Sequence, residues 1–343
     1  MKRYSREEFS RRLFIAMVNP WKAGTYELDE PALRKLVQYF LKQGQDKNIG
    51  LIVNPEAGEI FYMTRQEKAR VVEIVMEEVQ GRVPVVAGVH DVTTVGTLLV
   101  AHDVKRLQVD GVFAMPPIGA IDITTSWNPV SYPEVWLDEI KEIDKICDLP
   151  ILAHPVGAPS MAFGIGIPLE TTMAICDAVP NMVGWKMTYN WEGWKRVGRA
   201  LKKREPSVAI LGACASLFHE AIASNLFDGT VTGSFNYAME PMLEHFDAFK
   251  RGDHEEALSI WDGGLSALQE WMYSDMSRIH IRYKVATWLR GLVPHPYMRP
   301  PMPAPRQEEI DALVSLMRDA KLSIISDEEV KALEPRPPLS VNL

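Results

Sequence analysis

The sequence predicts a closed (β/α)8 TIM barrel followed by a C-terminal helical extension. Eight short apolar runs, each bounded by Gly, Pro or Asn, recur up to residue 233, and segments of helical periodicity separate them. Apolar runs that are each followed by a helix are typical of buried parallel strands. Eight such units at a spacing of roughly thirty residues fit a barrel of this type.

An open doubly wound sheet is the alternative arrangement. The sequence favours the barrel because eight units are present and no GxGxxG fingerprint follows the first strand. The predicted strands are 12–18, 49–54, 83–89, 111–115, 149–154, 181–186, 208–213 and 228–233. Apolar residues that return every three or four positions predict helices over 30–44, 64–79, 133–146 and 170–179.

Helical periodicity continues after residue 238 without further strands. We therefore expect a barrel over residues 1–237 and a helical region with a tail over residues 238–343. A proline-rich connection precedes a last amphipathic helix, in which four apolar residues form one stripe. They are Ile310, Leu313, Leu316 and Met317.

The composition points to a compact protein with a small-molecule partner. Of the 343 residues 47% are hydrophobic, and 45 acidic against 37 basic residues give a formal net charge of −8. We find no basic block for nucleic acid or an anionic membrane. Three widely spaced cysteines without a CxxC pair predict buried thiols in a reducing compartment. The charged N-terminus lacks the apolar core of a secretion signal, so we expect a cytoplasmic protein.

A lone lysine, Lys186, closes the sixth apolar run. Catalytic groups of (β/α)8 barrels sit at the C-terminal ends of strands. An ammonium group in an apolar barrel mouth loses hydration, its pKa falls, and the neutral amine can form a Schiff base with a ketone. The alternative is that Lys186 pairs with a barrel carboxylate such as Glu59 or extends into solvent.

Five segments carry a resemblance that covers nearly the whole chain. They are VNPW (18–21), PEAGE (55–59), VGWK (183–186), DGTVTGSFN (228–236) and LRGLVPHPYMRPPMP (289–303). In this order they resemble the dihydrodipicolinate synthase / N-acetylneuraminate lyase family of class I aldolases. The resemblance implies that Lys186 is the imine-forming lysine and that the chain forms a homo-oligomer, a dimer or a tetramer. We expect no metal and no other cofactor, since the spacing of His90, Asp91 and His102 is not that of a ligand set.

The resemblance also assigns the residues around the ketone. Glu56 and Ala57 stand where the family has paired threonines that hold the carboxylate of pyruvate, and Gly58 is kept. A protein carboxylate at this position would repel the carboxylate of pyruvate. A substrate with an uncharged oxygen in place of that carboxylate is therefore the alternative. With Ala57 and Gly58, three residues of the last strand segment are expected to border the ketone. They are Thr232, Gly233 and Asn236.

The tyrosine that shuttles protons in the family is replaced by Ala153. The neighbouring His154 is the first candidate to take over this role, because an imidazole is a competent acid and base near neutral pH. Tyr189 is the second candidate, and His90, after the third strand, is a further ionisable group. The alternatives are that His154 only bonds a neighbouring loop and that His90 only caps a helix beginning near Thr93.

Apolar and aromatic residues are expected in loops that ring the barrel mouth, and they predict a pocket for a hydrophobic or aromatic body. They are Met115, Pro116, Pro117, Ile118, Trp127, Met161, Phe163, Trp185, Trp191 and Trp194, with core packing favoured for the last two. The sequence thus predicts a class I lyase acting on a 2-oxo acid or related carbonyl compound with such a portion. Imine-based dehydration, hydration or deamination, and a non-catalytic ligand-binding barrel, are the alternatives.

Overall fold

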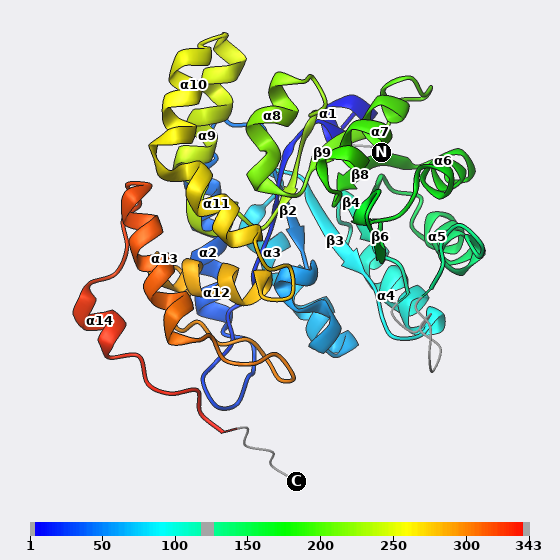
Figure 1. The fold of residues 1–343 in the computed structure, drawn as a ribbon. Coiled ribbons are helices and arrows are strands. Elements are labelled where there is room, and N and C mark those ends of the chain that lie inside the picture. The colour runs from blue at the N-terminus through cyan, green and yellow to red at the C-terminus, as the bar shows by residue number, and fades with distance from the viewer. Residues whose placement is uncertain (1–3, 118–126, 339–343) are drawn as a thin grey trace.

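The predicted eight-stranded barrel is confirmed by the computed structural model, which describes residues 4–117 and 127–338 (Figure 1). All eight barrel strands pair in parallel, and the order around the closed barrel is β1-β10-β9-β8-β5-β4-β3-β2. The strands are β1 (Leu13–Ala16), β2 (Ile49–Val53), β3 (Val85–Val89), β4 (Gly111–Ala114), β5 (Ile151–Ala153), β8 (Met182–Met187), β9 (Ala209–Gly212) and β10 (Gly229–Thr232).

Helices follow the strands and form an outer layer (Figure 1). Local capping explains where they begin. The Thr64 hydroxyl accepts a hydrogen bond from the backbone N–H of Glu67 (3.2 Å), and the Glu67 carboxylate accepts one from the backbone N–H of Thr64 (2.8 Å). The helices up to the last barrel strand are α1 (Arg6–Ser10), α2 (Glu30–Gln43), α3 (Arg65–Val79), α4 (Thr94–Arg106), α5 (Glu134–Cys147), α6 (Leu169–Ala178), α7 (Trp191–Lys202) and α8 (Phe218–Ala223).

A short hairpin after β5 was not predicted. Strand β6 (Val156–Ser160) pairs antiparallel with β7 (Gly164–Gly166), and Gly164 adopts a φ of 66°. Glycine suits this left-handed conformation because it has no Cβ. The hairpin places Val156 and Ile165 near the C-terminal ends of the barrel strands.

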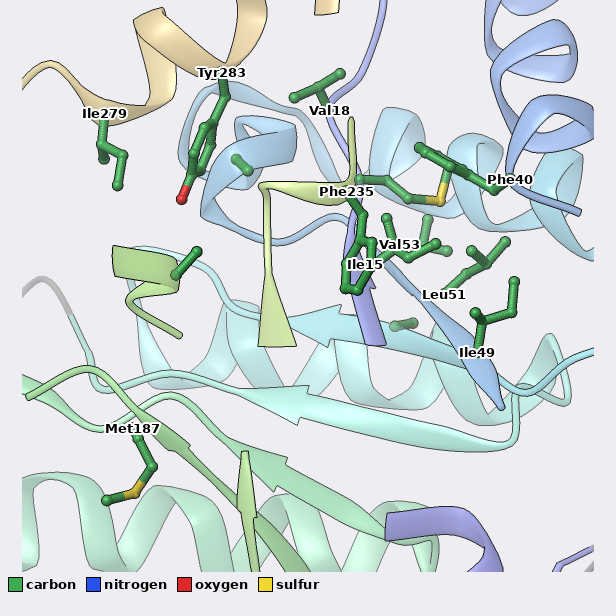
Figure 2. Close-up of a cluster of buried hydrophobic side chains, with 14 of the residues drawn as sticks. Ile15, Val18, Phe40, Ile49, Leu51, Val53, Met187, Phe235, Ile279 and Tyr283 are labelled. Carbon is green, nitrogen blue, oxygen red and sulfur yellow. The ribbon is translucent and has the colours of Figure 1, made fainter. Parts of the chain in front are cut away.

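Side chains of the strands alternate between the barrel interior and the helical layer, as a period of two requires. Figure 2 shows part of the outer set, with Ile15, Leu51 and Val53 in a cluster that reaches Phe40 of α2. The inner set fills the barrel. It includes Phe14, Ile52, Val86, Phe113, Leu152, Leu211 and Val231.

The C-terminal helices gather along one side of the barrel (Figure 1). The predicted boundary at residue 238 falls inside α9, where Ala238 has a non-helical φ of −124°; the division into two domains there stays a prediction. The predicted stripe lies in α13, with Ile310, Leu313 and Met317 buried. These helices are α9 (Phe235–Arg251), α10 (His254–Ile260), α11 (Ser266–Tyr273), α12 (Ile279–Leu289), α13 (Gln307–Asp319) and α14 (Asp327–Lys331), with a π-helical turn over Trp261–Leu265. No described helix is both long and apolar enough to cross a membrane.

A buried ion pair fixes α12 to the barrel. The Lys284 amine lies 2.9 Å from a Glu59 carboxylate oxygen, and both side chains are almost fully buried. Glu59 also accepts hydrogen bonds from the Trp21 indole (2.7 Å) and the backbone N–H of Arg299 (2.7 Å). The alternative in which Glu59 pairs with Lys186 is therefore wrong, since this carboxylate is committed to Lys284.

Candidate active site

A cavity of about 150 Å³ lies at the C-terminal ends of the barrel strands. Its floor and walls come from the barrel, and its roof comes from α11, α12 and the loop between them. Barrel residues that line it include Glu56, Ala57, His154, Lys186, Thr188, Cys214, Thr232 and Gly233. The roof residues are Tyr273, Met276, Ile279, His280 and Tyr283.

Lys186 points into this cavity because of its place in β8. Its neighbours Trp185 and Met187 belong to the cluster of the helical layer, and Figure 2 shows Met187 on the helix-covered side. The Lys186 amine lies 5.7 Å from the ring centroid of Phe113. Within the described residues no carboxylate forms an ion pair with it. Burial lowers the pKa of the Lys186 amine, with Glu56 acting in the opposite direction.

Glu56 and His154 meet beside the lysine. Glu56 belongs to a 3-10 turn after β2 (Glu56–Gly58), and His154 directly follows β5, where its backbone N–H donates to the Ala114 carbonyl (2.8 Å). The His154 Nδ1 lies 3.0 Å from a Glu56 carboxylate oxygen. The imidazole stacks on the Phe113 ring with centroids 5.6 Å apart.

Burial shifts both groups of this pair toward their uncharged forms. It raises the pKa of the Glu56 carboxyl, an effect that Lys186 opposes. It lowers the pKa of His154 well below 6.5, and the nearby Lys186 and His280 act in the same direction. In their uncharged forms the two groups together carry no net charge.

The structure brings some of the predicted substrate-binding residues to the cavity. Ala57, Thr232 and Gly233 line it together with Glu56. Their contacts with a substrate stay a prediction.

Gly58 and Asn236 lie next to the cavity and do not line it. The Gly58 carbonyl accepts a hydrogen bond from the Asn19 amide (2.7 Å). Asn236 accepts from the backbone N–H of Val18 (3.1 Å) and donates to the Ala16 carbonyl (2.8 Å). Asn236 therefore ties the end of β1 to the start of α9.

Tyr189 lies on the outer side of the barrel, so its prediction as a site residue is corrected. Its hydroxyl donates to the Ile167 carbonyl (3.0 Å) and accepts from the Trp185 indole (3.0 Å). Both partners belong to the helical layer, and the fully committed hydroxyl does not reach the cavity.

His90 is buried against Phe61, with ring centroids 4.9 Å apart, and does not line the cavity. Burial lowers the pKa of His90 to about 4. The helix cap is Thr93, whose hydroxyl accepts from the backbone N–H of Gly96 (3.0 Å). His90 is thus neither the cap of α4 nor a cavity group.

The predicted aromatic ring around the cavity is also corrected. Trp185 is fully buried in the helical layer, and Met161 is 98% exposed; Trp194 is fully buried, as the favoured prediction of core packing has it. None of the described members of the set lines the cavity, and Ile118 lies outside the described residues. Trp185 and Trp194 face the helical layer because of the alternation along β8 and the amphipathic face of α7.

Sequence reasoning missed the roof. Tyr273, His280 and Tyr283 lie more than eighty residues beyond Lys186 in the chain, in a segment that reads only as helix upon helix. One signal was present. Every described residue of α12 except His280 is buried, although the helix contains Arg282 and Lys284. Polar residues on a helix without an exposed face indicate contact with a polar interior feature.

The model of the dihydrodipicolinate synthetase family matches residues 9–320. The chain belongs to this family. A 4-hydroxy-tetrahydrodipicolinate synthase from Oceanobacillus iheyensis is 25% identical over 90% of this chain and 96% of its own length. An N-acetylneuraminate lyase from Escherichia fergusonii is 26% identical over 73% of this chain and 77% of its own length.

The fold of the dihydrodipicolinate synthetase family recurs in solved structures. A prophage protein of this family from Escherichia coli K12, determined in complex with pyruvate, superposes with a TM-score of 0.75 at 18% identity. The superposition covers 91% of this chain and 98% of that protein. As a member of this family, the chain is a lyase of the class I aldolase type.

Proposed function

We propose that this chain is an aldolase in which the Lys186 amine condenses with the ketone of pyruvate or another small 2-oxo acid. One observation carries the proposal: an inward-facing lysine without a carboxylate partner among the described residues lines a roofed cavity at the barrel mouth. Burial favours the neutral amine, which is the nucleophilic form. The pyruvate complex of the Escherichia coli prophage protein supports a substrate of this class.

The neighbouring pair supplies the proton transfers. In the cleavage direction the neutral His154 imidazole takes the proton from the substrate hydroxyl, and the bond between carbons 3 and 4 breaks. Its electron pair moves into the iminium on Lys186 and gives an enamine, while the aldehyde leaves. His154 then returns the proton to carbon 3, and water hydrolyses the imine to release the 2-oxo acid and the free amine.

In this proposal Glu56 assists the base, His154, and does not prevent the substrate carboxylate from binding nearby. Its carboxyl group, 3.0 Å from the imidazole, orients His154 and shares the proton that the ring accepts. Because one proton neutralises the pair, Glu56 need not repel the carboxylate of a 2-oxo acid.

The size of the cavity favours a compact substrate. Its volume of about 150 Å³ is smaller than the roughly 300–1,000 Å³ typical of pockets for drug-sized ligands. The apolar residues of the wall include Val156, Ile165 and Val231. We therefore propose a 2-oxo acid of few carbons with at most a small apolar portion.

Exchange of the pyruvate methyl protons in D2O tests this function, because exchange requires both the imine and a base. NMR should show exchange with the unaltered protein and none with Lys186→Ala at unchanged circular dichroism. His154→Phe should slow exchange by about 100-fold or more, the usual contribution of a positioned base. His90→Phe is the matched control and should retain the rate. Exchange that survives Lys186→Ala would exclude the imine. A larger loss of exchange rate in His90→Phe than in His154→Phe would show that His154 is not the base.

A further inference from the structure

Tyr283 of α12 occupies a space that only a glycine leaves open. A Cβ built on Gly233, at the end of β10, would lie 2.4 Å from Cε2 of the Tyr283 ring. Any larger residue at 233 would therefore displace the ring. Figure 2 shows Tyr283 extending from its helix, with the hydroxyl oxygen at the far end. This side chain lines the cavity and is 4% exposed.

The hydrogen bonds around Tyr283 fix the direction of its proton. The hydroxyls of Tyr283 and Tyr273 are 2.6 Å apart, and the Tyr273 hydroxyl lies 2.7 Å from the Ala213 carbonyl. A carbonyl only accepts, so Tyr273 donates there. The Tyr273 oxygen must then accept from Tyr283, and its second acceptor site faces the Thr232 hydroxyl at 3.0 Å.

Tyr283 therefore offers the cavity an acceptor. Its single hydroxyl proton is donated to Tyr273, so Tyr283 has no proton left to donate to the cavity. The lone pairs of its oxygen can still accept a hydrogen bond. A substrate hydroxyl can donate to this oxygen. A carbonyl or carboxylate oxygen at the same place would meet no donor.

Two further features of the cavity fit a neutral hydroxylated substrate. The Thr188 hydroxyl, two residues after Lys186, lines the cavity and is buried without a hydrogen-bond partner among the described residues. No arginine is among the described residues that line the cavity, and Lys186 is the only lysine there. Because Lys186 is consumed by the imine, a second carboxylate or a phosphate would have no cation to pair with.

We infer that Tyr283 contacts the substrate by accepting a hydrogen bond from a hydroxyl beyond carbon 4, distinct from the hydroxyl whose proton His154 takes. Gly233 and Tyr273 are positioning residues. Gly233 leaves room for the Tyr283 ring, and Tyr273 accepts the hydrogen bond from the Tyr283 hydroxyl. The inference rests on the proposed function, and it narrows the substrate class to small 2-oxo acids that carry a second neutral hydroxyl beyond the one that bond cleavage uses.

Reductive trapping at Lys186 with three matched compounds tests the inference. They are 2-oxopentanoate, 5-hydroxy-2-oxopentanoate and 6-hydroxy-2-oxohexanoate, none of which carries the carbon-4 hydroxyl that cleavage needs. Cyanoborohydride is the reductant, and mass spectrometry of the labelled peptide is the readout. One hydroxylated compound should half-saturate at an about tenfold lower concentration than 2-oxopentanoate, as expected for one added hydrogen bond. Tyr283→Phe should abolish this preference, and Tyr273→Phe should reduce it because Tyr283 then loses the hydrogen bond that positions its hydroxyl.

Tyr237→Phe is the matched control. The Tyr237 hydroxyl belongs to the same buried network, 2.7 Å from the Gln269 side-chain oxygen, and does not line the cavity. This variant should keep the preference. An equal response to all three compounds, or a preference that survives Tyr283→Phe, overturns the inference and leaves the proposed function standing. If none of the compounds labels Lys186 in the unaltered protein, the proposed function itself fails, and the inference with it.

Discussion

The charge on Glu56 affects the pKa of the Lys186 amine. In its ionised form, which burial disfavours, the Glu56 carboxylate stabilises the ammonium form of Lys186. Glu56 therefore raises the pKa of Lys186 against the larger effect of burial. In Glu56→Gln this stabilisation is lost, and the pKa of Lys186 should fall further. Because only the neutral amine reacts, the rise of the trapping rate with pH should shift to lower pH in this variant. The measurement is the pH profile of reductive trapping with pyruvate.

The exposed Glu192 provides the control for this shift. Glu192 pairs with Lys195 on the surface of α7, so Glu192→Gln should leave the profile in place. A profile of Glu56→Gln that stays unchanged or moves to higher pH would show that Glu56 does not act on the amine.

Single residues differ in how much the sequence reveals. The position of Lys186 and His154 at the cavity could be predicted, because each is a lone ionisable residue at the end of an apolar run, where the barrel fold fixes its direction. Tyr189 could not be placed, since β8 ends at Met187 and the alternation is lost beyond it. Tyr283 depends on a contact with Gly233 across fifty residues, which no local pattern records.

At the scale of elements, the buried Lys284–Glu59 pair connects α12 to the loop after β2. Removing one partner leaves the other charge buried and unpaired, so Lys284→Met should lower the free energy of unfolding by about 3–5 kcal/mol. The double variant Lys284→Met with Glu59→Gln should recover a large part of this loss. Urea unfolding of the single and double variants measures both effects.

Lys47 offers the matched surface pair. Its ion pair with Asp247 is solvent-exposed, so Lys47→Met should cost about 1 kcal/mol or less. A loss in Lys284→Met no larger than that in Lys47→Met would mean that the buried pair does not hold the roof in place.

The barrel strands and main helices follow from local chemistry. Parallel strands covered on both sides read as apolar runs, and capping residues such as Thr64 mark helix starts. The β6–β7 hairpin could not be predicted, because its segment contains glycine and proline without alternation of polar and apolar residues. The roof formed by α11 and α12 could not be predicted either. Helical periodicity predicts a helix but does not say which strand ends that helix will cover.

At the scale of the whole molecule, the site is assembled from distant parts of the chain. The barrel contributes Lys186, His154 and Glu56 to the cavity, and the C-terminal helices close it above them. The homo-oligomer expected from the family resemblance stays a prediction.

The central claim is that the cavity exists to bring a carbonyl compound to one amine. Reductive trapping of the unaltered protein with pyruvate, followed by peptide mapping, tests it most directly. We predict a single adduct at Lys186, with Lys284 unmodified because Glu59 holds its equally buried amine. An adduct at another lysine, or none at any concentration of pyruvate or the other 2-oxo acids, would contradict the account.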